Sequence, residues 1–205
     1  MKNKPQILYI HGGSTFSRRA SYLKFLKDRP VSAGERIRWH DAYLDRQLGG
    51  KCEIIRPKMP CAECASYEDW KLHLERHLPL LRRNIILIGS SLGGIFLARY
   101  LSENKFPKKI LAAYLVCPPF DNSLPGEEIC CGFRLPRDLA LLEKNCRRLT
   151  LLFSKDDTTV PPAHAEKYAR RLKKAEIVVY ESKNGHFKVP EFPEIVAMIR
   201  ADLRT

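Results

Sequence analysis

Residues 84–94 read NIILIGSSLGG, and residues 95–100 continue as IFLARY. The apolar run at the start is short and rich in isoleucine, which predicts a strand buried on both faces. The next residues form the pattern Gly-x-Ser-x-Gly with Ser91 at its centre, and an apolar helical segment follows at once. A strand, a sharp turn and a helix are the context in which this pattern presents a nucleophile. We therefore predict that Ser91 is a nucleophile at the carboxyl end of a strand.

The rest of the chain repeats this alternation of strand and helix. The expected strands span residues 6–10, 52–56, 84–89, 110–117, 149–154 and 176–180. The expected helices span residues 20–27, 37–48, 67–81, 94–103, 135–145, 163–172 and 193–203. Strands separated by helices are joined by crossovers, which make a sheet parallel. The pattern predicts a doubly wound α/β fold: a mostly parallel six-stranded sheet with helices on both faces.

The 205 residues contain no linker, repeat or change of composition that would divide them. Because one domain typically takes about 150 residues, we expect residues 1–205 to form a single domain. The connection 118–148 has room for a loop and one helix, but not for a large inserted lid domain. We therefore expect an open site.

A serine hydroxyl needs a base and an acid, and in this fold both follow later strands in the order Ser, acid, His. The sequence Lys155-Asp-Asp-Thr-Thr-Val-Pro161 follows the fifth expected strand. Its Asp157 has the D-x-x-V-P register and is our predicted acid. Asp156 remains the alternative, either solvated or bonded to loop amides. His186, which follows a glycine after the sixth strand, is our predicted base.

The remaining histidines lack that loop position. We expect the pair four residues apart on a helix to lie on the surface, although such a pair can also bind a metal. We expect His164, at a helix start behind two prolines, to be exposed. The residues set aside as base are His11, His40, His73, His77 and His164.

An oxyanion hole needs two backbone donors, one after the nucleophile and one from the loop after the first strand. The first is the N–H of Leu92. The loop after the first strand begins His11-Gly-Gly-Ser-Thr. We predict Gly13 as the second donor because the small neighbouring residues let its N–H face the oxyanion, with Ser14 as the alternative.

These motifs resemble the α/β-hydrolase superfamily. More narrowly, the chain is similar to small lidless serine hydrolases related to retinoblastoma-binding protein 9 and to the bacterial YdeN-type esterases. The resemblance rests on the serine turn 89–94, on Asp156-Asp157 followed by Val160-Pro161, and on Gly185-His186-Phe187. It implies a Ser91–Asp157–His186 triad and hydrolysis of esters or amides without a cofactor.

The sequence thus predicts a serine hydrolase that forms an acyl-enzyme on small, short-chain ester, amide or thioester substrates. Two alternatives stay open. The same triad suits an acyltransferase or thioesterase, to which a cationic surface could bring an anionic acyl donor. A hydrolase fold can also serve as a non-catalytic interaction module, which would have no need of a triad.

Charge and cysteine content suggest no further function. Lys and Arg exceed Asp and Glu by 36 to 23, a net charge of +13, but they are spread in short pairs with no nucleic-acid motif. We expect a solvated cationic surface and no nucleic-acid partner. Without a secretion signal or a run near the roughly 20 apolar residues of a membrane helix, we expect a cytoplasmic protein without membrane contact. The CxxC of Cys61 and Cys64 has no second pair, so we expect seven reduced thiols and no metal.

Overall fold

The computed structural model describes residues 4–34 and 37–204. Its centre is a six-stranded sheet in the order β2-β1-β3-β4-β5-β6, and every neighbouring pair is parallel. The strands are β1 Gln6–Ile10, β2 Glu53–Ile55, β3 Ile85–Ser90, β4 Ile110–Val116, β5 Cys146–Ser154 and β6 Glu176–Tyr180. The predicted doubly wound α/β fold is confirmed.

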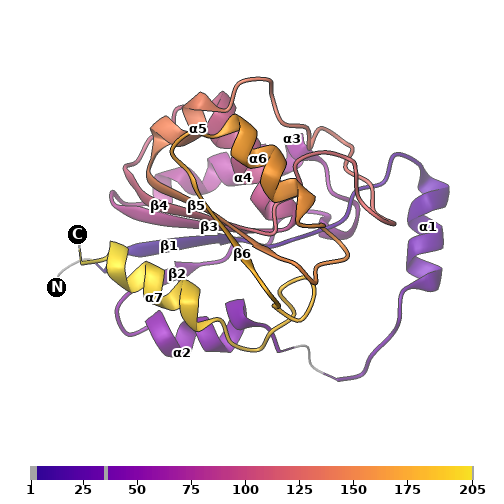
Figure 1. Ribbon diagram of the computed structural model, residues 1–205, viewed down its shortest axis with the longest axis horizontal. Coiled ribbons are helices and arrows are strands. Elements are labelled where there is room, and N and C mark those ends of the chain that lie inside the picture. The colour runs from indigo at the N-terminus through magenta and orange to yellow at the C-terminus, as the bar shows by residue number, and fades with distance from the viewer. Residues whose placement is uncertain (1–3, 35–36, 205) are drawn as a thin grey trace.

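Helices cover both faces of this sheet (Figure 1). On one face lie α3 Tyr67–His77, α4 Leu92–Glu103, α5 Ala140–Asn145 and α6 Ala163–Arg171, and on the other lie α2 Leu44–Leu48 and α7 Pro193–Asp202. A π-helical turn, Trp39–Tyr43, leads into α2, and 3₁₀ turns span Ala62–Cys64 and Leu78–Leu80. This two-sided cover explains why the central strands are apolar on both faces.

The strand β3 and the helix α4 form the middle of the core. Five of the six residues of β3 are buried, and nine of the twelve residues of α4 are buried. In the register of the sheet, Ser90 lies opposite Val116, the last residue of β4. The carboxyl ends of the two central strands therefore meet at one edge, and α4 begins at that edge.

The helix expected over residues 135–145 is shorter than predicted, since α5 covers only Ala140–Asn145. Pro136 lies in the part that is not helical, and a proline restricts the backbone of the residue before it. The Asp138 carboxylate then accepts a hydrogen bond from the N–H of Ala140 at 2.8 Å, which marks the start of the helix. The sheet strand β5 begins directly after α5, three residues earlier than expected.

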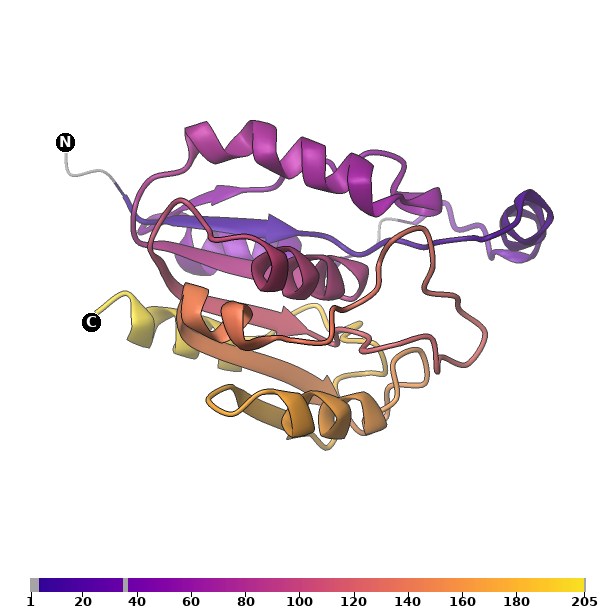
Figure 2. The ribbon, with the colours of Figure 1, turned by 90° about the horizontal axis from the view of Figure 1, so that it is seen from above.

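The remaining helix, α1 Arg19–Asp28, lies beyond the carboxyl ends of the strands, away from the body of the fold (Figures 1 and 2). It contains no buried residue. The connection 117–139 contains no helix or strand, so no large lid is built from it.

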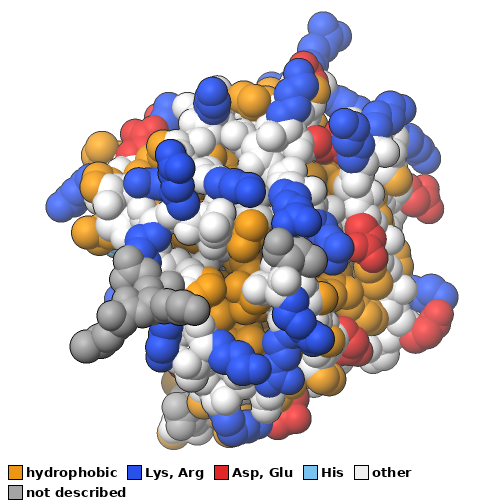
Figure 3. Space-filling view, turned by 90° about the vertical axis from the view of Figure 1, so that its left-hand side faces the viewer, with side chains coloured by type: hydrophobic (Ala, Val, Ile, Leu, Met, Phe, Trp, Pro, Cys, Tyr) orange, Lys and Arg blue, Asp and Glu red, His pale blue; other side chains and the backbone are white. Residues whose placement is uncertain are grey.

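Basic residues gather at the opposite edge, where the strands begin (Figure 3). Three of the basic pairs, Arg82-Arg83, Lys108-Lys109 and Arg147-Arg148, lie at or just before the amino ends of β3, β4 and β5. The edge with these pairs is therefore not the edge that carries Ser91. Within the part of the chain that the structure describes, no helix has the length and apolar character needed to cross a membrane.

Candidate active site

Ser91 sits in a strained turn between β3 and α4. Its backbone has φ 52° and ψ −119°, a conformation that non-glycine residues rarely adopt. Its N–H donates to the carbonyl of Val116 at 2.8 Å, which ties the turn to β4. A Cβ on Gly89 would lie 2.5 Å from the carbonyl oxygen of Gly93, and one on Gly93 would lie 2.4 Å from that of Ile10. Both glycines are required by close packing around the serine.

The three residues predicted as a triad are in hydrogen-bond contact. Ser91 Oγ lies 2.9 Å from His186 Nε2, and His186 Nδ1 lies 2.7 Å from Asp157 Oδ2. The other carboxylate oxygen of Asp157 accepts the backbone N–H groups of Thr159 and Val160, both at 2.9 Å. Because its carboxylate is buried and held by these amides, Asp157 fixes the orientation of the imidazole.

The imidazole of His186 has a raised pKa. Burial lowers the pKa, but the nearby sulfur of Cys117 and the hydrogen bond to Asp157 raise it, and the upward effects prevail. The imidazolium is the form that a histidine takes after it has accepted a proton from a serine. The surroundings of His186 therefore stabilise the product of that proton transfer.

Asp156 has a different role from its neighbour. Its carboxylate accepts the backbone N–H groups of Gly185 at 3.0 Å and of Lys183 at 3.1 Å, and the hydroxyls of Ser154 and Ser182. These hydrogen bonds, that of Gly185 first, hold the pKa of Asp156 far below its usual range. Asp156 thus joins the end of β5 to the loop that carries His186. This agrees with the expectation that Asp156 bonds to loop amides.

The expectation that His164 is exposed is wrong. Its side chain is buried, its Nδ1 accepts the N–H of Phe120 at 2.9 Å, and its Nε2 lies 3.2 Å from the carbonyl of Ser123. Burial lowers its pKa. The ring therefore braces the loop after β4. His11 also has a bracing contact, because its Nε2 accepts the N–H of Met59 at 3.0 Å.

No hydrogen bond joins the other three described histidines to Ser91 Oγ, although His40 lines the same small cavity as Ser91. His77 Nδ1 lies 2.8 Å from the carbonyl of His73, and their rings are 4.6 Å apart on α3. His40 stacks on Tyr9 at 4.8 Å. Among the described histidines, His186 is the one hydrogen-bonded to the serine.

Two backbone segments meet beside Ser91, the start of α4 and the loop after β1. Leu92 is the first residue of α4, and the first amides of a helix have no acceptor within the helix. The loop after β1 passes alongside, because a Cβ on Gly12 would lie 3.3 Å from Ser91 Cβ. A helix start and a glycine loop side by side are suited to hold an oxyanion.

The loop after β1 offers two candidate donors for the oxyanion hole, Gly13 and Ser14, and their contacts differ. The N–H of Ser14 donates to the carbonyl of Ala62 at 2.8 Å, so it is already engaged. A Cβ on Gly13 would lie 2.4 Å from that same carbonyl oxygen, so only glycine fits there. These contacts favour Gly13 over Ser14 as the donor.

Cys117 is a residue of this site that the sequence reasoning missed. It directly follows β4, it is 2 % exposed, and its sulfur lies 3.7 Å from His186 Nε2. Sulfur, imidazole and the Asp157 carboxylate form a group whose candidate ligand atoms all lie within 4.8 Å of one another. One feature of the sequence could have placed Cys117 near the site: it is the last residue of the strand expected over 110–117, and that strand ends at the edge that carries Ser91.

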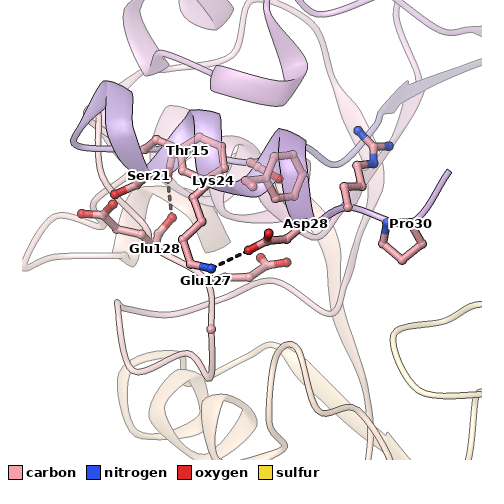
Figure 4. Close-up of a pocket in the computed structure, with 12 residues that line it drawn as sticks. Thr15, Ser21, Lys24, Asp28, Pro30, Glu127 and Glu128 are labelled. Atoms are coloured by element: carbon pink, nitrogen blue, oxygen red, sulfur yellow. Dashed lines mark hydrogen bonds and ion pairs between the residues drawn. The ribbon is translucent and has the colours of Figure 1, made fainter.

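Two cavities lie at this edge. The one at Ser91 and His186 has a volume of about 170 Å³, and Trp39, Cys117 and Lys188 also line it. The larger, of about 610 Å³, lies between α1 and the loop 126–128 (Figure 4). In Figure 4, Lys24 and Asp28 of α1 form an ion pair on one wall, and Glu127 and Glu128 belong to the other. None of the three residues predicted as a triad lines this larger cavity.

Known proteins resemble this chain in sequence and in fold. The sequence matches the family model described as serine hydrolase over residues 35–195, which is more than half of the chain. The chain belongs to the serine hydrolase family. It is therefore an enzyme of the hydrolase class, and the resemblance stated from the motifs is confirmed. No curated protein sequence gives a significant match.

Solved structures share the fold. The ydeN gene product from B. subtilis superposes with a TM-score of 0.77 at 20 % identity and covers 98 % of this chain and 100 % of its own. Est1E from Butyrivibrio proteoclasticus has a TM-score of 0.62 at 12 % identity, covering 100 % and 90 %. A thioesterase domain from the curacin biosynthetic pathway has a TM-score of 0.61 at 13 % identity, covering 96 % and 91 %. At such identities the likeness extends to the fold alone.

Proposed function

We propose that this hydrolase cleaves small carboxylic esters through an acyl-enzyme on Ser91, with His186 as base and Asp157 as the acid that orients it. The observation that carries the proposal is the pair of hydrogen bonds from Ser91 Oγ to the imidazole at 2.9 Å and from the imidazole to Asp157 at 2.7 Å. Three side chains far apart in the sequence meet in the order and geometry that nucleophilic catalysis requires.

In the acylation step, Ser91 Oγ attacks the ester carbonyl carbon while His186 Nε2 accepts the hydroxyl proton. The carbonyl π electrons move onto oxygen, and Asp157 stabilises the imidazolium through its contact with Nδ1. The imidazolium then gives its proton to the leaving alkoxide as the ester C–O bond breaks. A water molecule repeats the sequence on the acyl-enzyme, releasing the carboxylic acid and restoring Ser91.

The oxyanion forms where the N–H groups of Leu92 and Gly13 can donate to it. The positive end of the α4 dipole adds to their effect. Loss of one such donor in serine hydrolases costs about 3–4 kcal/mol of transition-state stabilisation. These donors need no movement of the helix, because α4 is anchored by its buried residues.

The small cavity at the serine favours short acyl groups. It has a volume of about 170 Å³, and the buried rings of Trp39 and Phe187 are part of its lining. A long acyl chain would have to leave this cavity and cross the exposed edge. We therefore expect acetyl and butyryl esters to be better substrates than long-chain lipids.

The proposal is tested with nitrophenyl esters of increasing acyl length on the purified protein. Ser91→Ala should lower kcat by at least about 10⁴-fold and abolish labelling by a fluorophosphonate probe. Ser90→Ala is a matched control, since it removes the neighbouring hydroxyl but leaves the hydrogen bond to His186. Labelling of the Ser91→Ala protein would overturn Ser91 as nucleophile, and an optimum at long chains would overturn the short-chain preference. A parallel thioester series determines which leaving atom the site prefers.

A further inference from the structure

Cys117 occupies a position that the proposed hydrolysis does not use. Its sulfur lies 3.7 Å from His186 Nε2, the same nitrogen that contacts Ser91 Oγ at 2.9 Å. Its backbone is fixed, because its N–H donates to the carbonyl of Leu152 at 2.7 Å and its φ is 42°. Ser91 follows β3 and Cys117 follows the neighbouring strand β4, so both side chains are placed in contact with His186 Nε2.

The separation of sulfur and nitrogen is that of two ligands on one zinc ion. With Zn–S near 2.3 Å and Zn–N near 2.05 Å, a tetrahedral angle puts the two ligand atoms about 3.6 Å apart. The observed distance of 3.7 Å matches that separation, so the two ligand atoms need not move apart, but the Ser91 hydroxyl has to turn away from Nε2 to make room for the ion. We propose that Cys117 Sγ and His186 Nε2 form a binding site for Zn²⁺ that inhibits the enzyme.

Asp157 completes the site without touching the metal. It contacts His186 Nδ1 at 2.7 Å, and a histidine that binds zinc through one nitrogen usually donates its other N–H to a carboxylate or carbonyl. The thiol of Cys117 releases its proton to solvent as the Zn–S bond forms. The Cys117 thiolate and the Asp157 carboxylate then balance the two positive charges of Zn²⁺ in this largely buried site.

An ion reaches the site through the small cavity, which Cys117, Ser91 and His186 all line. Its volume of about 170 Å³ leaves space for the water molecules that fill the remaining coordination positions. Two cations, Arg38 and Lys188, also line this cavity and oppose the entry of a cation. Soft sulfur coordination is therefore essential, and Mg²⁺, which prefers oxygen ligands, should not bind.

Zinc at this place would stop the proposed reaction directly. A metal on Nε2 takes the lone pair that accepts the Ser91 proton, and it takes the position of the 2.9 Å hydrogen bond. The inhibition should be reversible by a chelator because no bond within the protein is broken. This part of the inference rests on the proposed function, whereas metal binding itself does not.

The first experiment measures the rate of ester hydrolysis over a range of ZnCl₂ concentrations. It compares the wild type with Cys117→Ser and Cys117→Ala. The zinc concentration for half inhibition should rise at least about 100-fold in both variants, and EDTA should restore wild-type activity. Cys146→Ser, which removes another buried thiol, is the matched control and should keep the inhibition. Equal inhibition of wild type and both Cys117 variants would overturn the site, as would inhibition by Mg²⁺ at the same concentration.

The second experiment detects the metal without any catalysis. Co²⁺ is added to the Ser91→Ala protein, and the near-ultraviolet sulfur-to-cobalt band and the visible bands of tetrahedral cobalt are recorded. Both should appear, and both should be lost in Ser91→Ala/Cys117→Ser, while circular dichroism confirms the fold. If the bands persist in the double variant, the cobalt binds to other cysteines and the inference is wrong. If the bands depend on Cys117 but the wild type hydrolyses no ester, the zinc site stands and the proposed function fails.

Discussion

The helices α4 and α1 each follow a central strand of the sheet, yet they have opposite surroundings. α4 starts at Leu92, directly after Ser91, and nine of its twelve residues are buried. α1 follows β1 after a longer connection, projects beyond the edge of the sheet, and buries none of its ten residues (Figures 1 and 2). α4 thus begins where the proposed reacting groups meet, whereas α1 lies beyond that edge of the sheet (Figure 2).

Packing accounts for the difference. Phe96 of α4 meets Trp70 and Phe133 in an aromatic cluster, with ring centres 5.6 and 6.5 Å away. On α1, the ring contacts are with Phe16, a residue of the preceding loop, which lies 5.1 Å from Phe25. Trp70 belongs to α3 and Phe133 to the buried part of the connection 117–139, so α4 is enclosed by several elements, whereas the rings of α1 contact one loop residue. The start of α4 is therefore a rigid place for an oxyanion donor.

The largest expected effect belongs to the rigid part. Asp157→Asn keeps the shape of the side chain but removes the charge that orients His186, so kcat should fall by about 10⁴-fold. The measurement is nitrophenyl acetate hydrolysis near neutral pH. Asp156→Asn is the neighbouring control and should lose far less activity, since Asp156 contacts loop amides and not the imidazole. A greater loss from Asp156→Asn would assign the acid role to Asp156.

A pair of identical substitutions tests the burial contrast itself. Leu97 of α4 is 0 % exposed and Leu23 of α1 is 49 % exposed. Leu97→Ala should lower the free energy of unfolding by about 2–5 kcal/mol, because it leaves a cavity. Leu23→Ala should change it by no more than about 0.5 kcal/mol. Urea unfolding gives both values, and comparable losses would mean that α1 is packed in solution as tightly as α4.

The sequence predicted the central part of this fold well. The bounds of β1 agree with expectation, because an apolar run between turn residues leaves little choice to a strand that is buried throughout. The bounds of β6 agree as well, although β6 is an edge strand with no buried residue. The expected helix over 37–48 failed as one element, since a π-helical turn with a non-helical Asp41 precedes α2. Local periodicity does not reveal such a break, which depends on how Trp39 and Tyr43 are buried.

For the site, chain order was enough to bring three side chains into contact, because parallel strands end at one edge. It was not enough for Cys117 or His164. The first depends on a residue of the neighbouring strand pointing to the imidazole, and the second depends on the path of the loop that the ring supports. Both are contacts between distant segments, and neither leaves a periodic pattern in the sequence.

A smaller effect on stability is expected at Asp156, which joins the end of β5 to the loop that carries His186. The pKa of Asp156 is lowered in the folded state, so its contribution to stability is present above the unfolded pKa of about 3.9 and is lost as the pH falls toward the lowered value. Asp156→Asn should therefore lower the Tm at pH 7 and lower it less at pH 3. Thermal unfolding followed by circular dichroism gives both differences. A Tm difference that does not change with pH would show that the hydrogen bonds of Asp156 do not depend on its charge.

The smallest expected effect is on α1. Phe25 lines the cavity of about 610 Å³, and no residue of α1 lines the cavity at Ser91. Phe25→Ala should therefore leave kcat/KM for acetyl and butyryl nitrophenyl esters within about twofold of the wild type, a change of about 0.4 kcal/mol. The acyl-length series used for Ser91 provides the measurement. A tenfold fall on the acetyl ester would mean that α1 closes over the bound substrate. Both helices would then take part in the reaction, α4 at all times and α1 only while substrate is bound.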